Sequence, residues 1–380
     1  MKYAFRYLIK RILWILLHFF WIIPVDKKKI YFVSYKGMRY ACNPKYLYLK
    51  ILQLKGKSLK YVWSFLDVSR AKDVPEARVV KTNSFQSIIQ IMTSKIIIMN
   101  NNDISWFIPL RKQQILVETW HGGGAYKKTG LAAHSDSLFE KNQERLSRKI
   151  THYVSSCAKF TEIQSKAKLV PIEKFINTGM PRNEIFFHDI AGIKKTILNE
   201  FGILKEDIHI VLFAPTYRTK PGAKMQIVDF CKLQTTLQTK FGGEWKIFYR
   251  AHNYTKVDAS LLPEYVVDVS AYDDMQELLY VSDVLITDYS SCMWDFALTG
   301  RPCFLYMPDL DDYKEYDRDF FTSPDTWAYP YVKTEEELYN LIMDYDEKKS
   351  MQKIKNHLDL FGSYENANSC ELVLKSIGLI

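Results

Sequence analysis

A histidine followed by three glycines is unusual in a chain that has only 15 glycines among 380 residues. His121 precedes Gly122 and two further glycines, and Lys127 and Lys128 come shortly afterwards. Glycines let the backbone approach a ligand closely and leave N–H groups for an anion. Histidine is the natural proton acceptor near neutral pH. The alternative is a tight turn with a surface histidine, but consecutive glycines in a glycine-poor chain favour a functional loop.

Two further segments place cations where predicted strands end. Thr216 and Arg218 follow a buried apolar run, and an arginine at such a position can reach a phosphate. The alternative interpretation of Arg218 is a solvated surface side chain. Arg250 and His252 are two residues apart on an extended segment, so both side chains point to one side and can meet one anion.

Residues 284–296 carry the strongest signal, because a buried strand there ends in acidic and hydroxyl residues that begin a helix. Asp288 opens this polar part. Ser290 and Ser291 are predicted to cap the helix, whose N–H groups and positive dipole end would hold a phosphate. Asp295 lies four residues after Ser291 on the same face, where it would bind ribose hydroxyls. The alternative is an ordinary capped helix without a ligand.

Several other classes of site and partner are disfavoured. The net charge of +9 indicates a preference for anions, but the basic residues form no aromatic-interleaved stripe, so nucleic-acid binding is not expected. The six cysteines are far apart without a C-x-x-C pair, which argues against a zinc site and a disulfide framework. No P-loop or G-x-G-x-x-G motif is present. Asp309-Leu310-Asp311 has the D-x-D spacing of metal-dependent glycosyltransferases, but its late position favours a structural role.

Short apolar runs alternate with amphipathic stretches after residue 28, a pattern typical of βαβ units and a parallel sheet. The strands predicted in the first half are Ile30–Tyr35, Tyr61–Phe65, Ile96–Met99, Ile115–Thr119, His152–Ser155 and Phe175–Asn177. Those in the second half are Ile208–Ala214, Lys246–Arg250, Tyr265–Asp268, Val284–Thr287 and Cys303–Tyr306. The predicted helices are Pro44–Leu54, Ser84–Met92, Ser137–Arg148, Ile227–Lys240, Met275–Val281, Met293–Leu298 and Glu335–Asp344.

A chain of 380 residues exceeds what one hydrophobic core usually supports, so two domains are expected. We predict an α/β protein with two Rossmann-like domains and a ligand in the central cleft between them, at the carboxyl ends of the strands. The predicted divisions are an N-terminal membrane-associating helix at 1–27, an acceptor domain at 28–190, a donor domain at 191–349, and C-terminal helices at 350–380 that pack back on the first domain.

The N-terminus has a composition of its own. The run Ile12–Ile23 is apolar apart from His18, with basic residues before it and lysines at 27–29 after it. A helix of that length is too short for the hydrocarbon core of roughly 30 Å, and no signal-peptide cleavage site follows. We expect a helix lying in the inner leaflet, with its basic flanks on anionic head groups. The alternatives are a helix packed against the protein body and a single span that would bury several basic residues.

Taken in order, these segments resemble the CDP-glycerol glycerophosphotransferase family, which builds teichoic acids and related polyol-phosphate polymers in bacteria. The resemblance extends over about residues 30–320 and rests on a series of short motifs. They are Ser34–Gly37 with Asn43-Pro44, Trp120-His121-Gly122 with Lys127-Lys128, Thr178–Asn183, Ala214–Arg218, Arg250-Ala251-His252, Thr287–Ser291 with Asp295-Phe296, and Arg301-Pro302 with Tyr306 and Asp309–Tyr313.

The resemblance implies a GT-B-like fold and a peripheral, monotopic protein on the cytoplasmic face of the cell membrane. It implies transfer of glycerol phosphate, or a related polyol phosphate such as ribitol phosphate, from a CDP-activated donor to a hydroxyl of a lipid-linked glycan or polymer, with release of CMP. His121 would be the base, and His252 a second essential histidine at the transferred phosphate. The implied substrate-binding residues are Gly122, Lys127, Lys128, Arg182, Thr216, Arg218, Arg250, Asp288, Ser290, Ser291 and Asp295. No cofactor is expected, and the plentiful fixed cations make a metal not obviously required.

Two other functions stay open from the residues alone. A GT-B glycosyltransferase with a nucleotide-sugar donor would use the same phosphate-holding helix. A non-catalytic membrane-surface protein that binds anions is the alternative from another class, although binding alone needs neither His121 nor His252. The choice between glycerol and ribitol, the acceptor, the number of units added and the oligomeric state are also left open.

Overall fold

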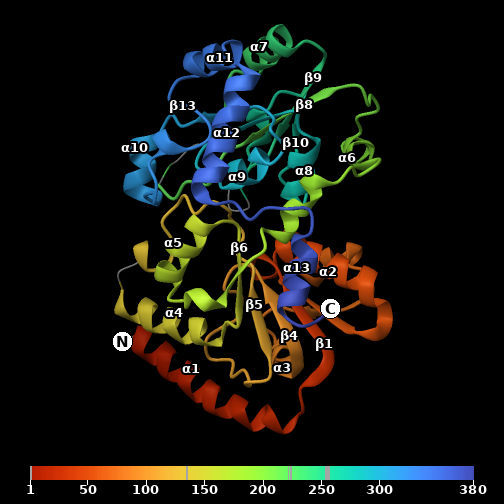
Figure 1. Cartoon of the computed structure of the whole chain (residues 1–380), viewed down its shortest axis with the longest axis vertical. Helices are drawn as coiled ribbons and strands as arrows, with labels where there is room; N and C mark the ends of the chain where they lie inside the picture. Colours follow the sequence, from red (N-terminus) through yellow and green to blue (C-terminus); the bar gives the residue numbers. More distant parts are fainter. Residues whose placement is uncertain (1, 134–135, 221, 223–224, 253–256) are drawn as a thin grey trace. The chain divides into compact units, whose positions relative to one another are not determined.

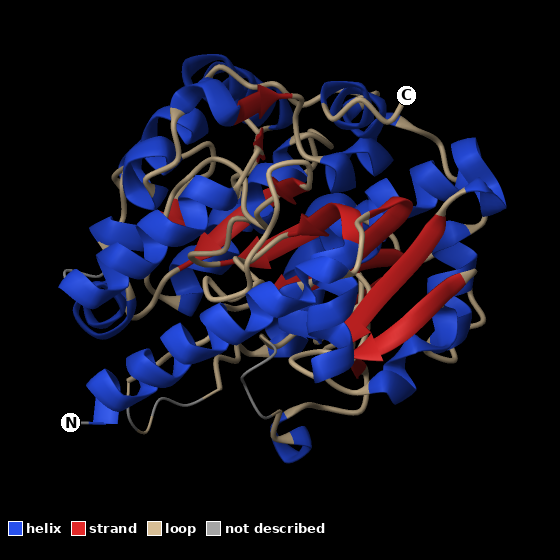
Figure 2. Cartoon of the chain, turned by 90° about the horizontal axis from the view of Figure 1, so that it is seen from below, coloured by secondary structure: helices blue, strands red, loops and turns tan. Residues whose placement is uncertain are grey.

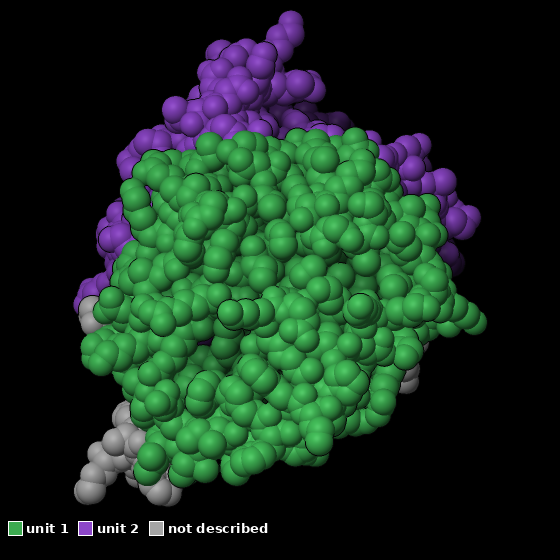
Figure 3. Space-filling model, turned by 60° about the horizontal axis from the view of Figure 1, so that its bottom comes forward, with its two compact units in different colours: residues 1–121, 129–184, 364–380 green, residues 122–128, 185–363 purple. Residues whose placement is uncertain are grey.

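The computed structural model of the chain describes residues 2–133, 136–220, 222, 225–252 and 257–380. The fold divides into two compact units, which are coloured separately in Figure 3. Unit 1 comprises residues 1–121, 129–184 and 364–380, and unit 2 comprises residues 122–128 and 185–363. The segment 122–128, which directly follows His121, therefore belongs to a different unit from the histidine.

Unit 1 is built on a seven-stranded sheet in the order β3-β2-β1-β4-β5-β6-β7, and every neighbouring pair is parallel. Figure 1 labels β1, β4, β5 and β6 of this sheet. The strands are β1 (Asp26–Val33), β2 (Lys60–Phe65), β3 (Ala77–Lys81), β4 (Ser94–Met99), β5 (Ile115–Glu118), β6 (His152–Ser155) and β7 (Phe175–Asn177). Central strands such as β4 are nearly continuous runs of buried apolar residues, as expected for a parallel sheet that is covered on both faces.

Helices flank the sheet of unit 1, as Figure 2 shows with helices and strands in separate colours. They are α1 (Lys2–His18), α2 (Cys42–Lys55), α3 (Phe85–Thr93), α4 (Ser137–Lys149), α5 (Ala158–Lys168) and the C-terminal α13 (Ser369–Ser376). Side-chain caps begin several of them. Ser84 accepts a hydrogen bond from the backbone N–H of Ser87 at the start of α3, and Asp136 accepts one from Leu138 at the start of α4.

Unit 2 repeats the same design with a six-stranded parallel sheet in the order β10-β9-β8-β11-β12-β13. Its strands are β8 (His209–Ala214), β9 (Trp245–Tyr249), β10 (Val266–Asp268), β11 (Val284–Thr287), β12 (Cys303–Tyr306) and β13 (Tyr331–Val332). Its helices are α6 (Ile193–Glu200), α7 (Phe230–Phe241), α8 (Met275–Val281), α9 (Cys292–Ala297), α10 (Leu310–Asp312), α11 (Glu335–Met343) and α12 (Glu347–Phe361). A capping box between Thr334 and Glu337 begins α11.

Both sheets have the doubly wound strand order, which reverses direction beside the first strand of each unit. The reversal lies between β1 and β4 in unit 1 and between β8 and β11 in unit 2. Ligands of open α/β sheets bind at the carboxyl ends of the strands at such points. His121 follows β5, next to the first reversal, and Arg218 and Asp288 follow β8 and β11 at the second.

The α/β class with parallel sheets is confirmed, and each predicted strand coincides with a strand of the structure. The sequence pattern missed β3, α5, the three-residue α10 and the two-residue β13. The division into units differs from the predicted boundaries. The first unit ends at Glu184 and resumes at Tyr364, so residues 350–363 belong to unit 2. The reason is that α12 buries Ile354, His357 and Phe361, and the His357 ring packs on Tyr126 and Trp294 of the same unit.

The N-terminal helix α1 packs on unit 1 with one side and exposes apolar residues on the other. Tyr7 stacks on Trp106 and hydrogen-bonds with Arg145 from α4, and Leu17 is buried. A short 3₁₀ helix, Phe19–Ile22, continues α1 before β1 begins. Among the described residues, none of the helices has the length and apolar character needed to cross a bilayer.

Candidate active site

His121 is held by the loop that follows β4. Its ring Nδ1 lies 2.8 Å from the carbonyl oxygen of Asn100. Because a carbonyl oxygen can only accept, Nδ1 carries the hydrogen and Nε2 is the basic nitrogen of the neutral ring. The ring centroid lies 4.5 Å from that of Trp120 and 5.6 Å from that of Tyr35. This tautomer gives His121 the arrangement that a general base requires.

Buried Asn43 at the start of α2 fixes the backbone beside His121. Its Nδ2 donates to the carbonyl oxygens of Thr119 and Trp120, both at 3.0 Å. Its Oδ1 accepts from the backbone N–H of Arg182 at 3.0 Å. Arg182 is only 1% exposed, and its Nη1 lies 3.3 Å from the Sγ of Cys42. The structure therefore places Arg182 in the buried support of the His121 loop, and its contact with substrate stays a prediction.

The glycine-rich segment after His121 is joined to unit 2 by its backbone and side chains. The N–H of Lys128 donates to the Asp319 carbonyl at 2.9 Å, and the N–H of Phe321 donates to the Tyr126 carbonyl at 2.8 Å. The Tyr126 hydroxyl lies 2.8 Å from Nε2 of buried His357. A Cβ atom on Gly123 would lie 2.1 Å from Cδ1 of Trp294. The glycine thus allows the segment to lie directly against α9.

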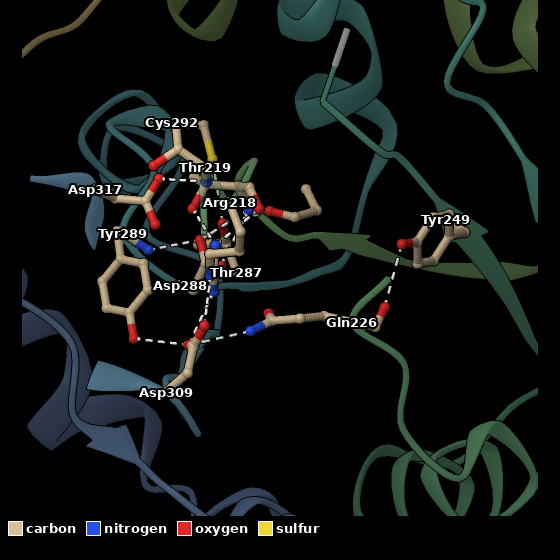
Figure 4. Close-up of polar contacts among 12 residues, drawn as sticks. Arg218, Thr219, Gln226, Tyr249, Thr287, Asp288, Tyr289, Cys292, Asp309 and Asp317 are labelled. Carbon is tan, nitrogen blue, oxygen red and sulfur yellow. Dashed lines mark hydrogen bonds and ion pairs between the residues drawn. The ribbon is translucent and has the colours of Figure 1, made fainter. Parts of the chain in front are cut away.

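Arg218 is the centre of the polar network at the carboxyl end of the unit 2 sheet (Figure 4). Its Nε and one Nη2 hydrogen bind both oxygens of Asp309, at 2.6 and 3.0 Å. The other Nη2 hydrogen binds Asp288 at 2.8 Å, and Nη1 donates to the carbonyl and hydroxyl oxygens of Thr216, both at 2.7 Å. These contacts use the five N–H donors of a guanidinium. Arg218 therefore braces three strand ends, and the neighbouring carboxylates raise its pKa.

Asp288 connects the ends of β8 and β11. Both of its carboxylate oxygens accept from the backbone N–H of Thr216 at 3.0 Å, and Oδ1 also accepts from the N–H of Tyr289 at 2.6 Å. The Tyr289 hydroxyl donates to Asp309 at 3.1 Å, and its ring stacks on Tyr313 with centroids 3.8 Å apart. The guanidinium of Arg218 lies 4.9 Å from the centre of the Tyr289 ring. Asp288 is 1% exposed, so its carboxylate joins the two strand ends in a buried position.

The sequence from residue 15 to residue 379 matches the family described as CDP-glycerol:poly(glycerophosphate) glycerophosphotransferase. The chain belongs to this family. It is therefore a polyol-phosphate transferase of the kind that takes part in teichoic acid synthesis. The resemblance drawn from the motifs around His121, Arg218 and Asp288 is thereby confirmed.

Individual relatives agree with the family assignment. The teichoic acid poly(glycerol phosphate) polymerase of Bacillus spizizenii is 28% identical over 99% of this chain and 98% of its own length. The teichoic acid poly(ribitol-phosphate) polymerase of the same strain is 26% identical over 94% of this chain, which spans only 57% of that longer protein. A solved structure of the wall teichoic acid polymerase TagF has a TM-score of 0.83, with 24% identity over 97% of this chain and 93% of that one. The last likeness shows that the two proteins share a fold.

The structure of this transferase gives the predicted phosphate-binding helix a different form from the expected one. Helix α9 has only six residues, and the Ser291 side chain makes no cap hydrogen bond. Ser290 Oγ instead accepts from the backbone N–H of Cys292 at 3.3 Å. Asp295 is 3% exposed, and its Oδ2 accepts from Nε2 of Gln276 at 2.9 Å, which ties α9 to α8. The roles of these residues in donor binding stay predictions.

Arg250 and His252 follow β9, as the sequence predicted. Arg250 Nη1 donates to the carbonyl oxygens of Val269 and Tyr272, at 3.2 and 2.9 Å. His252 is exposed, and its ring centroid lies 6.0 Å from that of Tyr217. The arginine is thus partly anchored by backbone, whereas the histidine is accessible to a substrate.

The two lysines of the glycine-rich segment have different surroundings. Lys128 forms an ion pair with Asp319. The Lys127 ammonium lies 5.9 Å from the centre of the Tyr313 ring. Burial lowers the pKa of Lys127 to about 8, with Arg318 and Arg218 acting in the same direction and Asp288 opposing them. An anion beside Lys127 would relieve that repulsion, and contact of Lys127 with a phosphate stays a prediction.

Several residues of the site had no role assigned from the sequence. Asn43 belongs to the Asn43-Pro44 motif, and Glu118 lies just before the motif that begins at Trp120. Asn100 directly follows a predicted strand, and these positions are the features of the sequence that point to the three residues. Asp309 was interpreted as structural, and its bidentate contact with Arg218 supports that reading. Among the described residues, no three His, Cys, Asp or Glu side chains gather as metal ligands would.

We expect Gly123→Ala to impair both stability and turnover. The added methyl would overlap the Trp294 ring, which is fully buried and has no room to move. Such overpacking costs about 1–3 kcal/mol of unfolding free energy, and displacement of the segment beside His121 should lower CMP release by at least about tenfold. Gly192→Ala is the control, since Gly192 has φ +78° but nothing near the added Cβ. It should carry backbone strain alone and leave turnover unchanged; equal turnover in the two variants would refute the role of this contact.

Proposed function

We propose that this enzyme transfers glycerol phosphate or ribitol phosphate from a CDP-activated donor to a hydroxyl of a lipid-linked glycan or polymer. The proposal is supported by membership of the family and above all by His121, whose Nδ1–H is committed to the Asn100 carbonyl so that Nε2 is basic. A base at the carboxyl end of a parallel sheet suits deprotonation of an attacking alcohol.

In the proposed reaction, the acceptor O–H gives its proton to Nε2 of His121. The oxygen attacks the β-phosphorus of the CDP-polyol, a new P–O bond forms, and the P–O bond to CMP breaks as CMP leaves in line. The product is a phosphodiester between the acceptor and the polyol. A proton donor for the leaving group is not needed, because the CMP phosphate leaves as an anion at neutral pH.

We further propose that Lys127, Arg250 and His252 stabilise the charge on the transferred phosphoryl group. His252 is supported by its exposure. Lys127 is supported by its position against the Tyr313 ring, where the half-buried ammonium forms no ion pair among the described residues. Arg218 differs from the sequence expectation, because its donors already bind Asp288, Asp309 and Thr216. We assign it the role of holding the strand ends rather than of contacting the phosphate. No resident cofactor is proposed.

We propose a GT-B-like arrangement of the two Rossmann-like units, with the donor bound by the unit 2 residues and the acceptor activated by His121. The doubly wound strand order of each sheet supports it. A product-length assay distinguishes the addition of one polyol unit from the addition of many.

The experiment that tests the function is CMP release by the purified enzyme with a lipid-linked acceptor extract. CDP-glycerol and CDP-ribitol are supplied separately, and CMP is separated by anion exchange. Release from one donor identifies the polyol and supports the proposal. Release of a nucleoside diphosphate from a nucleotide sugar, with no CMP from either donor, would overturn it in favour of a glycosyltransferase. Donor binding without any turnover would favour a binding protein.

A membrane-surface position on the cytoplasmic face is the second part of the proposal. Six of the exposed apolar residues of α1 and the turn after it recur at helical spacing and so share one face. They are Leu8, Ile12, Ile15, Leu16, Phe19 and Ile22. Phe19 is 74% exposed and Ile22 is 88% exposed, which is unusual for large apolar side chains unless another surface covers them. Lys10 and Arg11 are exposed on the same helix and suit anionic head groups.

We expect Ile12→Asp combined with Phe19→Asp to release the enzyme from vesicles that contain anionic phospholipid. Two carboxylates on the apolar face oppose insertion and repel the head groups, so the bound fraction should fall at least about tenfold in cosedimentation. Leu204→Asp is the control, because Leu204 is also an exposed apolar residue but lies on unit 2. Binding that survives the double substitution would contradict the proposed membrane face.

A further inference from the structure

Three loops of unit 1 meet around His121, and two carboxylates hold them together. The loops follow β1, β4 and β5. Asp103 accepts from the backbone N–H of Lys36 at 2.8 Å and from those of Asn100 and Asn101 at 3.1 and 3.2 Å. It therefore links the loop after β1 to the loop that carries the Asn100 carbonyl.

Glu118, the last residue of β5, links the other two loops. Its Oε1 accepts from the backbone N–H of Trp120 at 2.8 Å, and its Oε2 accepts from that of Asn102 at 2.9 Å. Its side chain is 0% exposed. Both donors belong to residues with left-handed backbone, φ +53° for Trp120 and φ +50° for Asn102. Such conformations are strained in non-glycine residues and persist only where surrounding contacts impose them.

The two hydrogen bonds of Glu118 bear directly on the general base. Trp120 immediately precedes His121, and Asn102 lies in the loop whose Asn100 carbonyl accepts from Nδ1 of His121. One carboxylate thus fixes both the backbone that carries the ring and the acceptor that selects its tautomer. Each Glu118 oxygen accepts one N–H, which suits an ionised carboxylate, whereas one of the two positions carries a hydrogen in a protonated acid or an amide and accepts poorly or not at all.

We propose that Glu118 is a positioning residue for His121, whose ionised carboxylate holds the imidazole in the orientation and tautomer needed to deprotonate the acceptor. This inference rests on the proposed function, since it concerns the base of that reaction. Glu118 acts through the backbone of Trp120 and Asn102 and does not touch the reacting atoms.

The proposal predicts a dependence on pH that is separate from the titration of the base itself. Burial raises the pKa of Glu118 to about 8, the charge of Asp103 adds to the rise, and the N–H bonds from Asn102 and Trp120 oppose it. The other charged or titratable groups that interact with it are Lys168 from α5, which lowers the pKa of Glu118, and Tyr153 from β6. The ionised form therefore gains population as the pH rises through about 8, and kcat should rise with it.

The test is Glu118→Gln, assayed for CMP release between pH 6 and pH 9.5. The amide keeps one acceptor oxygen and turns an N–H donor toward a backbone N–H, so one loop is released. We expect kcat at pH 8.5 to fall by about 10- to 100-fold, with KM for the CDP-polyol within about twofold. The kcat limb near pH 8 should disappear. A merely structural role would lower kcat without removing that limb.

Glu337→Gln is the matched control. Glu337 also accepts from two backbone N–H groups, those of Lys333 and Thr334, but it lies in unit 2 at the start of α11. It should leave the pH profile unchanged. If Glu118→Gln does not fold, Asp103→Asn provides a second test, because loss of that charge should move the wild-type limb to lower pH.

The positioning role would be overturned if kcat of Glu118→Gln still rose near pH 8, or if this rise stayed at the same pH in Asp103→Asn. The proposed function would still be supported by CMP release from the wild-type enzyme. Absence of CMP release by the wild-type enzyme would overturn the proposed function instead.

Discussion

We expect His121→Ala to lower CMP release by about 10²- to 10⁴-fold, the range that a positioned general base contributes. The alanine has neither the basic Nε2 nor the Nδ1–H that binds the Asn100 carbonyl. Binding of the CDP-polyol should change little, because the proposed donor contacts come from unit 2. The measurements are CMP release under saturating donor and donor affinity by calorimetry.

Two further histidine variants sharpen that result. His121→Gln keeps an amide N–H that can donate to a carbonyl but has no basic nitrogen, so it should be nearly as inactive as the alanine variant. His209→Ala is the control, because His209 stacks on Trp245 at the opposite end of β8 from Arg218. Its turnover should match that of the wild type. Near-normal turnover in His121→Ala would exclude His121 as the base.

The second large effect is expected on stability. Arg218→Met should destabilise unit 2 by about 3–5 kcal/mol, because removing one partner of a buried ion pair leaves an uncompensated charge. The Arg218 and Asp288 side chains are 7% and 1% exposed, and Asp309 is 27% exposed. The substitution would leave both carboxylates without their cation and the Thr216 oxygens without the Arg218 donor.

The measurement is amide hydrogen exchange in β8 and β11 at equilibrium, which reports unit 2 separately from unit 1. Lys220→Met is the matched control, since Lys220 pairs with Asp312 and both side chains are at least 40% exposed. A surface pair of this kind contributes about 0–1 kcal/mol. Equal protection in the two variants would show that the Arg218 network does not hold the strand ends together.

Much of the fold could be predicted from the sequence, because the buried strands of a parallel sheet are short runs of apolar residues. The runs at 96–99, 208–214 and 284–287 all form strands, and the polar residues after them lie at the carboxyl ends of the two sheets. The missed elements have weaker patterns. β3 has one buried residue, Val80, and α5 carries several polar residues on its buried side.

The roles of individual site residues could not be predicted as well, because their hydrogen-bond partners come from parts of the chain that only the fold brings together. Arg218 was expected to reach a phosphate, but Asp288 and Asp309 come from strands that follow it by many residues in the chain. The distances of Glu118 and Asn43 from other polar residues in the sequence did not single them out. Their importance follows from the backbone N–H and carbonyl groups with which they form hydrogen bonds.

The sequence by itself determined the α/β class, the general base candidate and the family, because strand periodicity, glycine clusters and ordered motifs are local properties of the chain. Only the tertiary structure decided that residues 122–128 belong to unit 2. It also decided that the N–H groups of Arg218 donate to two carboxylates and that Glu118 holds the backbone beside His121. Buried donors and acceptors must find partners wherever the fold brings them, so these pairings depend on sheet order rather than on distance along the chain.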